Sequence, residues 1–192
     1  MSTGRIQALT DGVYAIAMTI LVLTLDVPAT TPTSAALLKA LLRLAPKFFD
    51  FTLSFLLLAI FWSIHHRHFH VITRVDIKLL WINIFSLLFV VLIPFTTTLY
   101  GEYRNVTTAA IFFELNILVL GLIKYVHWSY ATAGKRLVSL DLPEAEIVRG
   151  RRISMVTPVV ALVAIAVATF SPENSTSLFM LVPILTGALR RL

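Results

Sequence analysis

Ionisable and hydroxyl side chains lie where two long apolar segments of the sequence reach one side of a membrane. Thr10 and Asp11 stand at the start of the first segment. A carboxylate near the start of a membrane span is costly unless it is paired. Trp62, His65 and His66 end the second segment, and an indole or imidazole N–H can donate to a carboxylate. We therefore predict a hydrogen-bonded network between the two helices.

The histidine-rich stretch at the end of the second segment could instead hold a metal ion. His66 and His70 lie one helical turn apart, a spacing that allows two metal ligands. No carboxylate stands in the position of a general base, as it does in H-E-x-x-H. The sequence also lacks cysteine, a phosphate-binding glycine loop and a G-x-S-x-G nucleophile motif. We therefore expect no catalytic residue, no metal site, no cofactor and no enzymatic activity.

The first apolar segment has an uncharged stripe along one side. Successive residues of an α-helix advance by about 100°. This places Gly12, Ile16, Thr19, Ile20 and Leu23 together, with Asp11 on the opposite side. Such a stripe could line a narrow pore, but apolar stripes are common on membrane helices that contact lipid or another helix. The spacing alone favours packing.

Composition places these segments in an all-α, polytopic membrane protein. Hydrophobic residues make up 58% of the 192 residues and charged residues only 14%, against about 25% charged in soluble domains. The net charge is +6, and the basic residues gather at the ends of apolar runs. That pattern is typical of cytoplasmic loops beside anionic lipid. We therefore expect a lipid bilayer, and no nucleic acid, as the partner of the basic residues.

Runs of about 20 apolar residues predict six transmembrane helices. The predicted spans are residues 7–27, 48–64, 79–100, 107–130, 153–170 and 178–189. The sixth is short and contains Pro183. Residues 29–34 are predicted to form a loop and residues 35–44 an amphipathic interfacial helix. The loop residues Asp76 and Lys78 are expected to be solvated.

The distribution of Lys and Arg predicts the orientation. The loops after the second and fourth spans and the C-terminal end are rich in Lys and Arg, and the loops at 101–106 and 171–177 carry at most one. Because basic loops stay in the cytoplasm, both termini are predicted to be cytoplasmic in a plasma-membrane protein. No internal repeat is evident, so residues 1–192 are predicted to form a single six-helix transmembrane domain.

Two motifs resemble a known family. The segment from Arg5 to Ile16, followed by Thr19 to Leu25, resembles the first-helix signature of the transmembrane protein 175 family: Arg, then Phe-Ser-Asp, then an apolar run. The segment Phe61 to Arg67 resembles its Trp-x-x-His motif in the second helix. Here Leu9-Thr10 replaces Phe-Ser, which keeps a hydroxyl but loses an aromatic ring.

The resemblance implies a K⁺-permeable channel that prefers K⁺ to Na⁺. Members with one repeat are prokaryotic homotetramers whose first helix lines the pore. The family's tightest constriction then falls on Ile16, with further pore positions on Ile20 and Leu23 and a hydroxyl position on Thr19. These residues coincide with the stripe, so we favour pore lining over packing. The positioning network implied by the family and by the pairing argument comprises Arg5, Thr10, Asp11, Trp62, His65 and His66.

The alternative is a proton- or ion-coupled transporter that uses Asp11 and the histidine cluster. It would show saturable, coupled flux, whereas a channel passes unitary currents down the K⁺ gradient.

Overall fold

A computed structural model describes residues 3–29, 31 and 33–191, and these residues are helical apart from short connections. Five helical segments of this part of the chain are long and apolar enough to cross a membrane. They are α1 (Thr3–Ile20) with its 3₁₀ extension η1 (Leu21–Thr24), α3 (Ala45–Val71), α4 (Ile77–Glu102), α5 (Thr107–Thr132) and α6 (Glu144–Ala168). The first five predicted spans are confirmed as helices.

Two helices extend further than the apolar runs suggested. Helix α3 continues to Val71 and so includes the histidine-rich stretch, and α6 begins at Glu144, well before the predicted start at residue 153. Ile147 of this early part is 1% exposed and packs with Trp128 of α5. Apolar contacts therefore extend α6 beyond the hydrophobic run, through residues that the sequence predicts to form a basic loop.

The last segment is helical but interrupted. It consists of α7 (Pro172–Ser175), η3 (Thr176–Met180) and α8 (Leu181–Arg191). Pro183 lies in the first turn of α8, where its missing N–H is tolerated, whereas in a continuous helix it would remove an internal hydrogen bond. The predicted sixth span is thus present as broken helical structure, and its crossing of the membrane stays a prediction.

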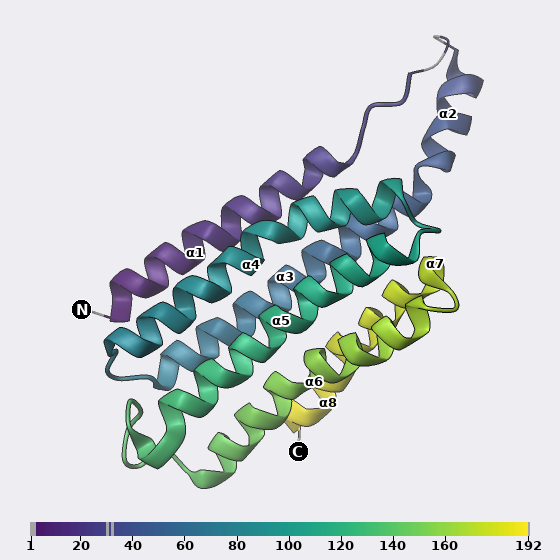
Figure 1. Cartoon of the computed structure of the whole chain (residues 1–192). Coiled ribbons are helices and arrows are strands. Elements are labelled where there is room, and N and C mark those ends of the chain that lie inside the picture. Colours follow the sequence, from purple (N-terminus) through teal and green to yellow (C-terminus); the bar gives the residue numbers. More distant parts are fainter. Residues whose placement is uncertain (1–2, 30, 32, 192) are drawn as a thin grey trace.

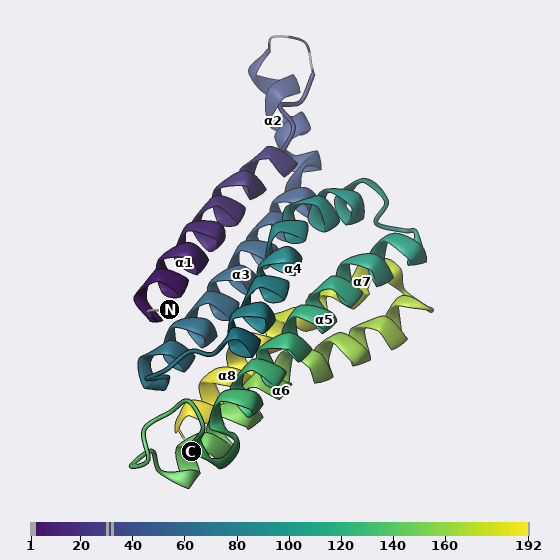
Figure 2. The ribbon, with the colours of Figure 1, turned by 60° about the vertical axis from the view of Figure 1, so that its left-hand side comes forward.

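The short helix α2 (Ser34–Arg43) matches the predicted amphipathic segment. Thr33 caps it by accepting a hydrogen bond from the backbone N–H of Ala36 at 3.3 Å. Residues 30 and 32 of the predicted loop before it lie outside the described residues. Helix α2 projects beyond the end of the bundle in both views (Figures 1 and 2).

The bundle is arranged so that α1 lies at one edge. Figure 1 shows α1 beside α4, which it contacts, and in both views α6 and α8 lie at the opposite edge (Figures 1 and 2). Helix α5 packs against both α4 and α6. The approach of α5 to α6 is close at Gly121, because a Cβ there would lie 2.8 Å from Pro158 Cδ. A small residue at this contact is typical of membrane helix packing.

Both chain ends lie at the same end of the bundle in both views (Figures 1 and 2). The loops at this end are tied together by the backbone, because Thr73 N–H donates to Leu137 O at 2.9 Å. Asp76 accepts from the N–H of Leu79 at 2.8 Å and from the hydroxyl of Tyr130. Asp76 is partly exposed, and in addition it caps α4.

Candidate functional site: the two faces of α1

The faces of α1 differ in their surroundings. Its buried residues recur every three or four positions and form one side of the helix: Ile6, Thr10, Tyr14 and Ala17, continued by Leu21 and Thr24 of η1. The predicted stripe lies on the other side, where Ile16, Ile20 and Leu23 are 59%, 44% and 75% exposed. Gly12 and Thr19 are exposed as well. The structure therefore leaves the whole stripe uncovered within one subunit.

The stripe offers apolar surface and one hydroxyl. Thr19 donates to the carbonyl of Ile16 at 2.9 Å, so its proton is used inside the helix and its oxygen can still accept a bond or contact a cation. In the 3₁₀ turn, side chains three positions apart eclipse, which aligns Leu23 with Ile20. A row of this kind can exclude water from a narrow passage while providing one polar contact.

Asp11 is held by α3. Trp62 Nε1–H donates to Asp11 Oδ1 at 2.8 Å, which links α1 to α3 at the same depth. The ring of His66 lies 5.6 Å from the ring of Trp62. Asp11, Trp62 and His66 are all exposed at the surface of the subunit.

The other predicted network residues lie elsewhere. Thr10 is buried and accepts a hydrogen bond from Asn83 Nδ2 of α4 at 2.9 Å. His65 is 1% exposed, and its ring lies 4.5 Å from that of Phe69 and 6.2 Å from that of His127. Neither ring nitrogen of His65 has a hydrogen-bond partner within the described residues. Arg5 is exposed and makes no ion pair there.

A polar seam lies behind the buried face of α1, and we define it by Thr10, His65, Asn83, Ser86, Lys124 and His127. Lys124 is 1% exposed, donates to Ser86 Oγ at 3.2 Å, and places its ammonium 5.6 Å from the ring centre of Tyr14. Ser86 in turn donates to the carbonyl of Asn83 at 2.7 Å. No carboxylate of the described chain forms an ion pair with Lys124. This seam was not predicted from the sequence, although a lysine within an apolar span is a usable signal.

The far end of the first segment is held by charge. Lys47 of α3 pairs with Asp26, just after η1, at 3.2 Å, and also with Glu102 of α4. Arg104 pairs with the buried Asp50 at 3.4 Å. The pair of Lys47 and Asp26 therefore connects the far end of the first span to α3. The hydrogen bond from Trp62 to Asp11 connects its start to α3, while the stripe stays uncovered.

Metal binding finds no geometric support in the part of the chain that the structure describes. No group of three His, Asp or Glu side chains there is arranged to hold a metal ion. His66 and His70 are exposed on α3.

Comparisons with known proteins identify the family. A family model described as "Endosomal/lysosomal potassium channel TMEM175" matches residues 5–94. A potassium channel of Chamaesiphon minutus is 33% identical over 149 residues, which cover 76% of this chain and 73% of that protein. The endosomal/lysosomal proton channel TMEM175 of Gallus gallus is 31% identical over 112 residues, which cover 55% of this chain and 22% of that protein.

A solved structure agrees in fold. The crystal structure of a lysosomal potassium-selective channel TMEM175 homolog from Chamaesiphon minutus superposes with a TM-score of 0.83 at 30% identity. The match covers 98% of this chain and 97% of that chain. The predicted resemblance is thereby confirmed: the chain is a multi-pass membrane protein that belongs to the TMEM175 family.

Proposed function

We propose that this chain forms a K⁺-permeable channel that prefers K⁺ to Na⁺, with α1 lining the pore. The observation that carries the proposal is the stripe of Gly12, Ile16, Thr19, Ile20 and Leu23, which is free of charge and uncovered in the subunit. The acid of the same helix is hydrogen-bonded to Trp62 of α3. The names of the relatives support the same activity.

A pore requires several copies of the chain, because one subunit leaves α1 at its edge (Figure 1). In the proposed homotetramer, four α1 helices meet at the axis and the Ile16 side chains form the narrowest ring. The segment from α7 to α8 completes a sixth crossing, and both termini lie in the cytoplasm. The assembly sits in the plasma membrane and needs no cofactor.

Selectivity in this arrangement comes from the cost of removing water. An apolar ring provides no oxygen to replace the hydration shell of the ion, and a narrow apolar constriction can also close by dewetting. K⁺ holds its water less tightly than Na⁺ and so passes at lower cost. The Thr19 oxygen, whose proton is bonded to Ile16 O, offers partial replacement beside the ring.

The test is bilayer recording of purified protein in asymmetric K⁺ and Na⁺. We expect unitary currents whose reversal potential lies toward that of K⁺. The variant Ile16→Asn should wet the ring and reduce the K⁺/Na⁺ permeability ratio. The matched control is Val22→Asn, because Val22 is an exposed apolar residue of the same span, 53% against 59% exposed, that lies off the stripe. An unchanged ratio in Ile16→Asn, or an equal change in Val22→Asn, would overturn the assignment of the ring.

The second candidate is a proton-coupled transporter, and the seam is the observation that favours it. Buried ionisable groups in membrane helices often form proton pathways, and Lys124, His65 and His127 are such groups. The relative from Gallus gallus is named a proton channel. Saturable flux that depends on a second ion, with no unitary currents, would favour this candidate over the channel.

A further inference from the structure

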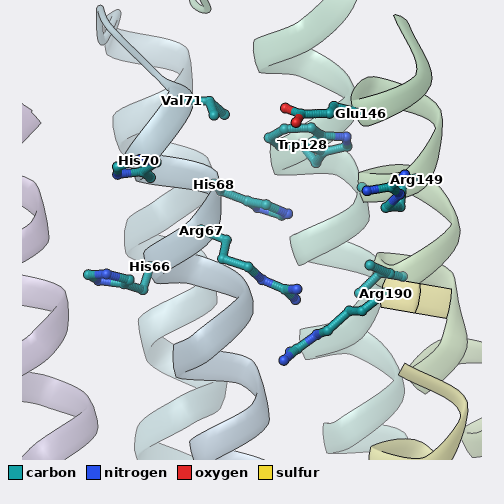
Figure 3. Close-up of a pocket in the computed structure, with 11 residues that line it drawn as sticks. His66, Arg67, His68, His70, Val71, Trp128, Glu146, Arg149 and Arg190 are labelled. Atoms are coloured by element: carbon teal, nitrogen blue, oxygen red, sulfur yellow. The ribbon is translucent and has the colours of Figure 1, made fainter. Parts of the chain in front are cut away.

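A cavity of about 670 Å³ lies at the end of the bundle that holds both termini. It is open to one side and is lined by residues of α3, α5, α6 and α8 (Figure 3), none of which belongs to the stripe of α1. A space of this size accommodates a drug-sized ligand, which is much larger than an inorganic anion. The proposed pore does not use this cavity.

Three arginines from three different helices line the cavity: Arg67 of α3, Arg149 of α6 and Arg190 of α8. Figure 3 shows Arg67 extending toward Arg190, whereas His66 and His70 point away from Arg190 on the other side of α3. The charges of Arg67 and Arg190 repel each other. Arginines gathered in this way favour an anion between them.

The cavity's own acid does not neutralise this charge. Glu146 is the acidic residue among the lining side chains, against three arginines. None of these arginines has a carboxylate within ion-pair distance in residues 3–29, 31 and 33–191. Arg149 also borders a second hollow beside Glu144, so Arg67 and Arg190 are the main candidates. Guanidinium groups bind phosphate through two parallel hydrogen bonds.

The inner wall of the cavity is apolar and rigid. Trp128 is buried, stacks on His68 at 4.5 Å, and donates its indole N–H to Ile147 O at 2.9 Å. Gly150 lies so close that a Cβ there would be 2.4 Å from the Trp128 ring. Val71 and Ile153 add aliphatic surface. Arginines beside an apolar wall fit a phosphate that is attached to hydrocarbon better than they fit a free phosphate.

We propose that this cavity binds the phosphate headgroup of an anionic phospholipid, with Arg67 and Arg190 as its main ligands. The glycerol and the first carbons of the acyl chains lie against Trp128, Val71 and Ile153. The basic loops at this end of the bundle would face the leaflet that is rich in anionic lipid. The site joins α3 to α8, so the lipid would also hold the last helix against the bundle.

The test measures lipid retention by native mass spectrometry after reconstitution of the full chain in phosphatidylcholine with added phosphatidylglycerol. We expect wild-type protein to retain phosphatidylglycerol selectively. The variant Arg67→Gln/Arg190→Gln should raise its dissociation constant about thirtyfold, since each arginine near an anionic surface contributes about a factor of five. The control Arg74→Gln/Lys78→Gln removes the same charge from exposed positions outside the cavity, at the same end of the bundle. This control should change the dissociation constant little.

Three results would overturn the proposal. Equal losses of phosphatidylglycerol binding in the cavity variant and the control variant would indicate general attraction to the charged surface. If wild-type protein retained phosphatidylglycerol no better than phosphatidylcholine, there would be no selective site. Displacement of the lipid by millimolar inorganic phosphate would indicate a site for soluble anions. If the double variant does not fold, the single variant Arg190→Gln, in the exposed last turns of α8, provides the same comparison at about fivefold.

Discussion

The two faces of α1 differ in how they are held. The buried face contacts α3 and α4 through tightly packed residues such as Tyr14 and through directed hydrogen bonds such as that from Asn83 to Thr10. The stripe makes no side-chain hydrogen bond to another helix among the described residues, because its one hydroxyl donates within α1. The helix is thus positioned from behind, and its front is left free.

This difference separates positioning from conduction. A charged or strongly hydrogen-bonding group on the stripe would bind an ion and slow its exit, whereas conduction requires weak binding. Polar groups on the opposite face fix the rotation of α1 about its own axis. We therefore expect changes to the buried face to alter stability first, and changes to the stripe to alter permeation first.

The largest effect on stability should come from Tyr14→Ala. Tyr14 is 1% exposed and carries the ring beneath the Lys124 ammonium, so its removal leaves a cavity and costs about 3 kcal/mol of unfolding free energy. Ile16→Ala, two residues along the chain and 59% exposed in the subunit, should change the K⁺/Na⁺ permeability ratio instead. Thermal unfolding in detergent micelles and bilayer recording of both variants check this. The reverse pattern would contradict the assignment of the two faces.

The positions of the long helices were predictable because hydrophobicity determines them. Runs such as residues 79–100 and 107–130 must be helical in a bilayer, where every backbone group needs an internal partner. The stripe was predictable for a similar reason, since helical spacing alone groups Ile16, Ile20 and Leu23. Helical spacing could not show that this group lines a pore, because a lipid-facing and a pore-facing surface can both be apolar. That prediction required the family resemblance.

The partners of the network residues were less predictable. The sequence places Asp11 near the level of Trp62. The Trp-x-x-His spacing points to His65, with His66 adjacent, but the directions of these two side chains depend on the rotation of α3. In the structure, His65 faces His127 and His66 lies beside Trp62. The pairing of Thr10 with Asn83 depends on which helix lies beside α1, and α4 is distant in sequence. Helix neighbours in space are not encoded in hydrophobic periodicity.

The cap of α4 by Asp76 is a polar contact that lies on neither face of α1. Burial alone would raise the pKa of Asp76, but hydrogen bonds from Tyr130 and the Leu79 N–H, with the charges of Arg136 and Lys78, outweigh it and lower the pKa. The stabilisation is therefore present above the ordinary value of 3.8 and is lost as the pH falls through the lower pKa of the folded state.

Asp76→Ala should therefore lower the free energy of unfolding at neutral pH by about 1 kcal/mol, the usual value of a helix cap. Asp76→Asn keeps the acceptor and should remove the pH dependence. Thermal unfolding between neutral pH and about pH 3 measures both. The K⁺/Na⁺ permeability ratio should be unchanged in both variants. An altered ratio would mean that loss of the α4 cap changes the position of the stripe.

The bond between Trp62 and Asp11 lies at the boundary between the two faces. Trp62→Phe keeps the ring but removes the N–H that Asp11 accepts at 2.8 Å. Because both side chains are exposed in the subunit, we expect a loss of less than about 1 kcal/mol. A change in open probability without a change in permeability ratio would place Asp11 among the positioning residues. A shift in the ratio itself would place it in the ion path.

The smallest change in stability should come from the hydrogen bond between Thr10 and Asn83. This pair tests whether the seam holds α1 through a direct contact with α4. A double-mutant cycle of Thr10→Val and Asn83→Ala should give a coupling energy of about 0.6 kcal/mol, as for other hydrogen bonds between membrane helices. The control cycle pairs Thr10→Val with Thr97→Val, since Thr97 lies on α4 but bonds Ser54 instead. Equal coupling in both cycles would mean that the 2.9 Å contact has no special part in holding α1. A larger value in the first cycle alone would establish it as one of the contacts that fix the rotation of the helix, and hence the direction in which Ile16 points.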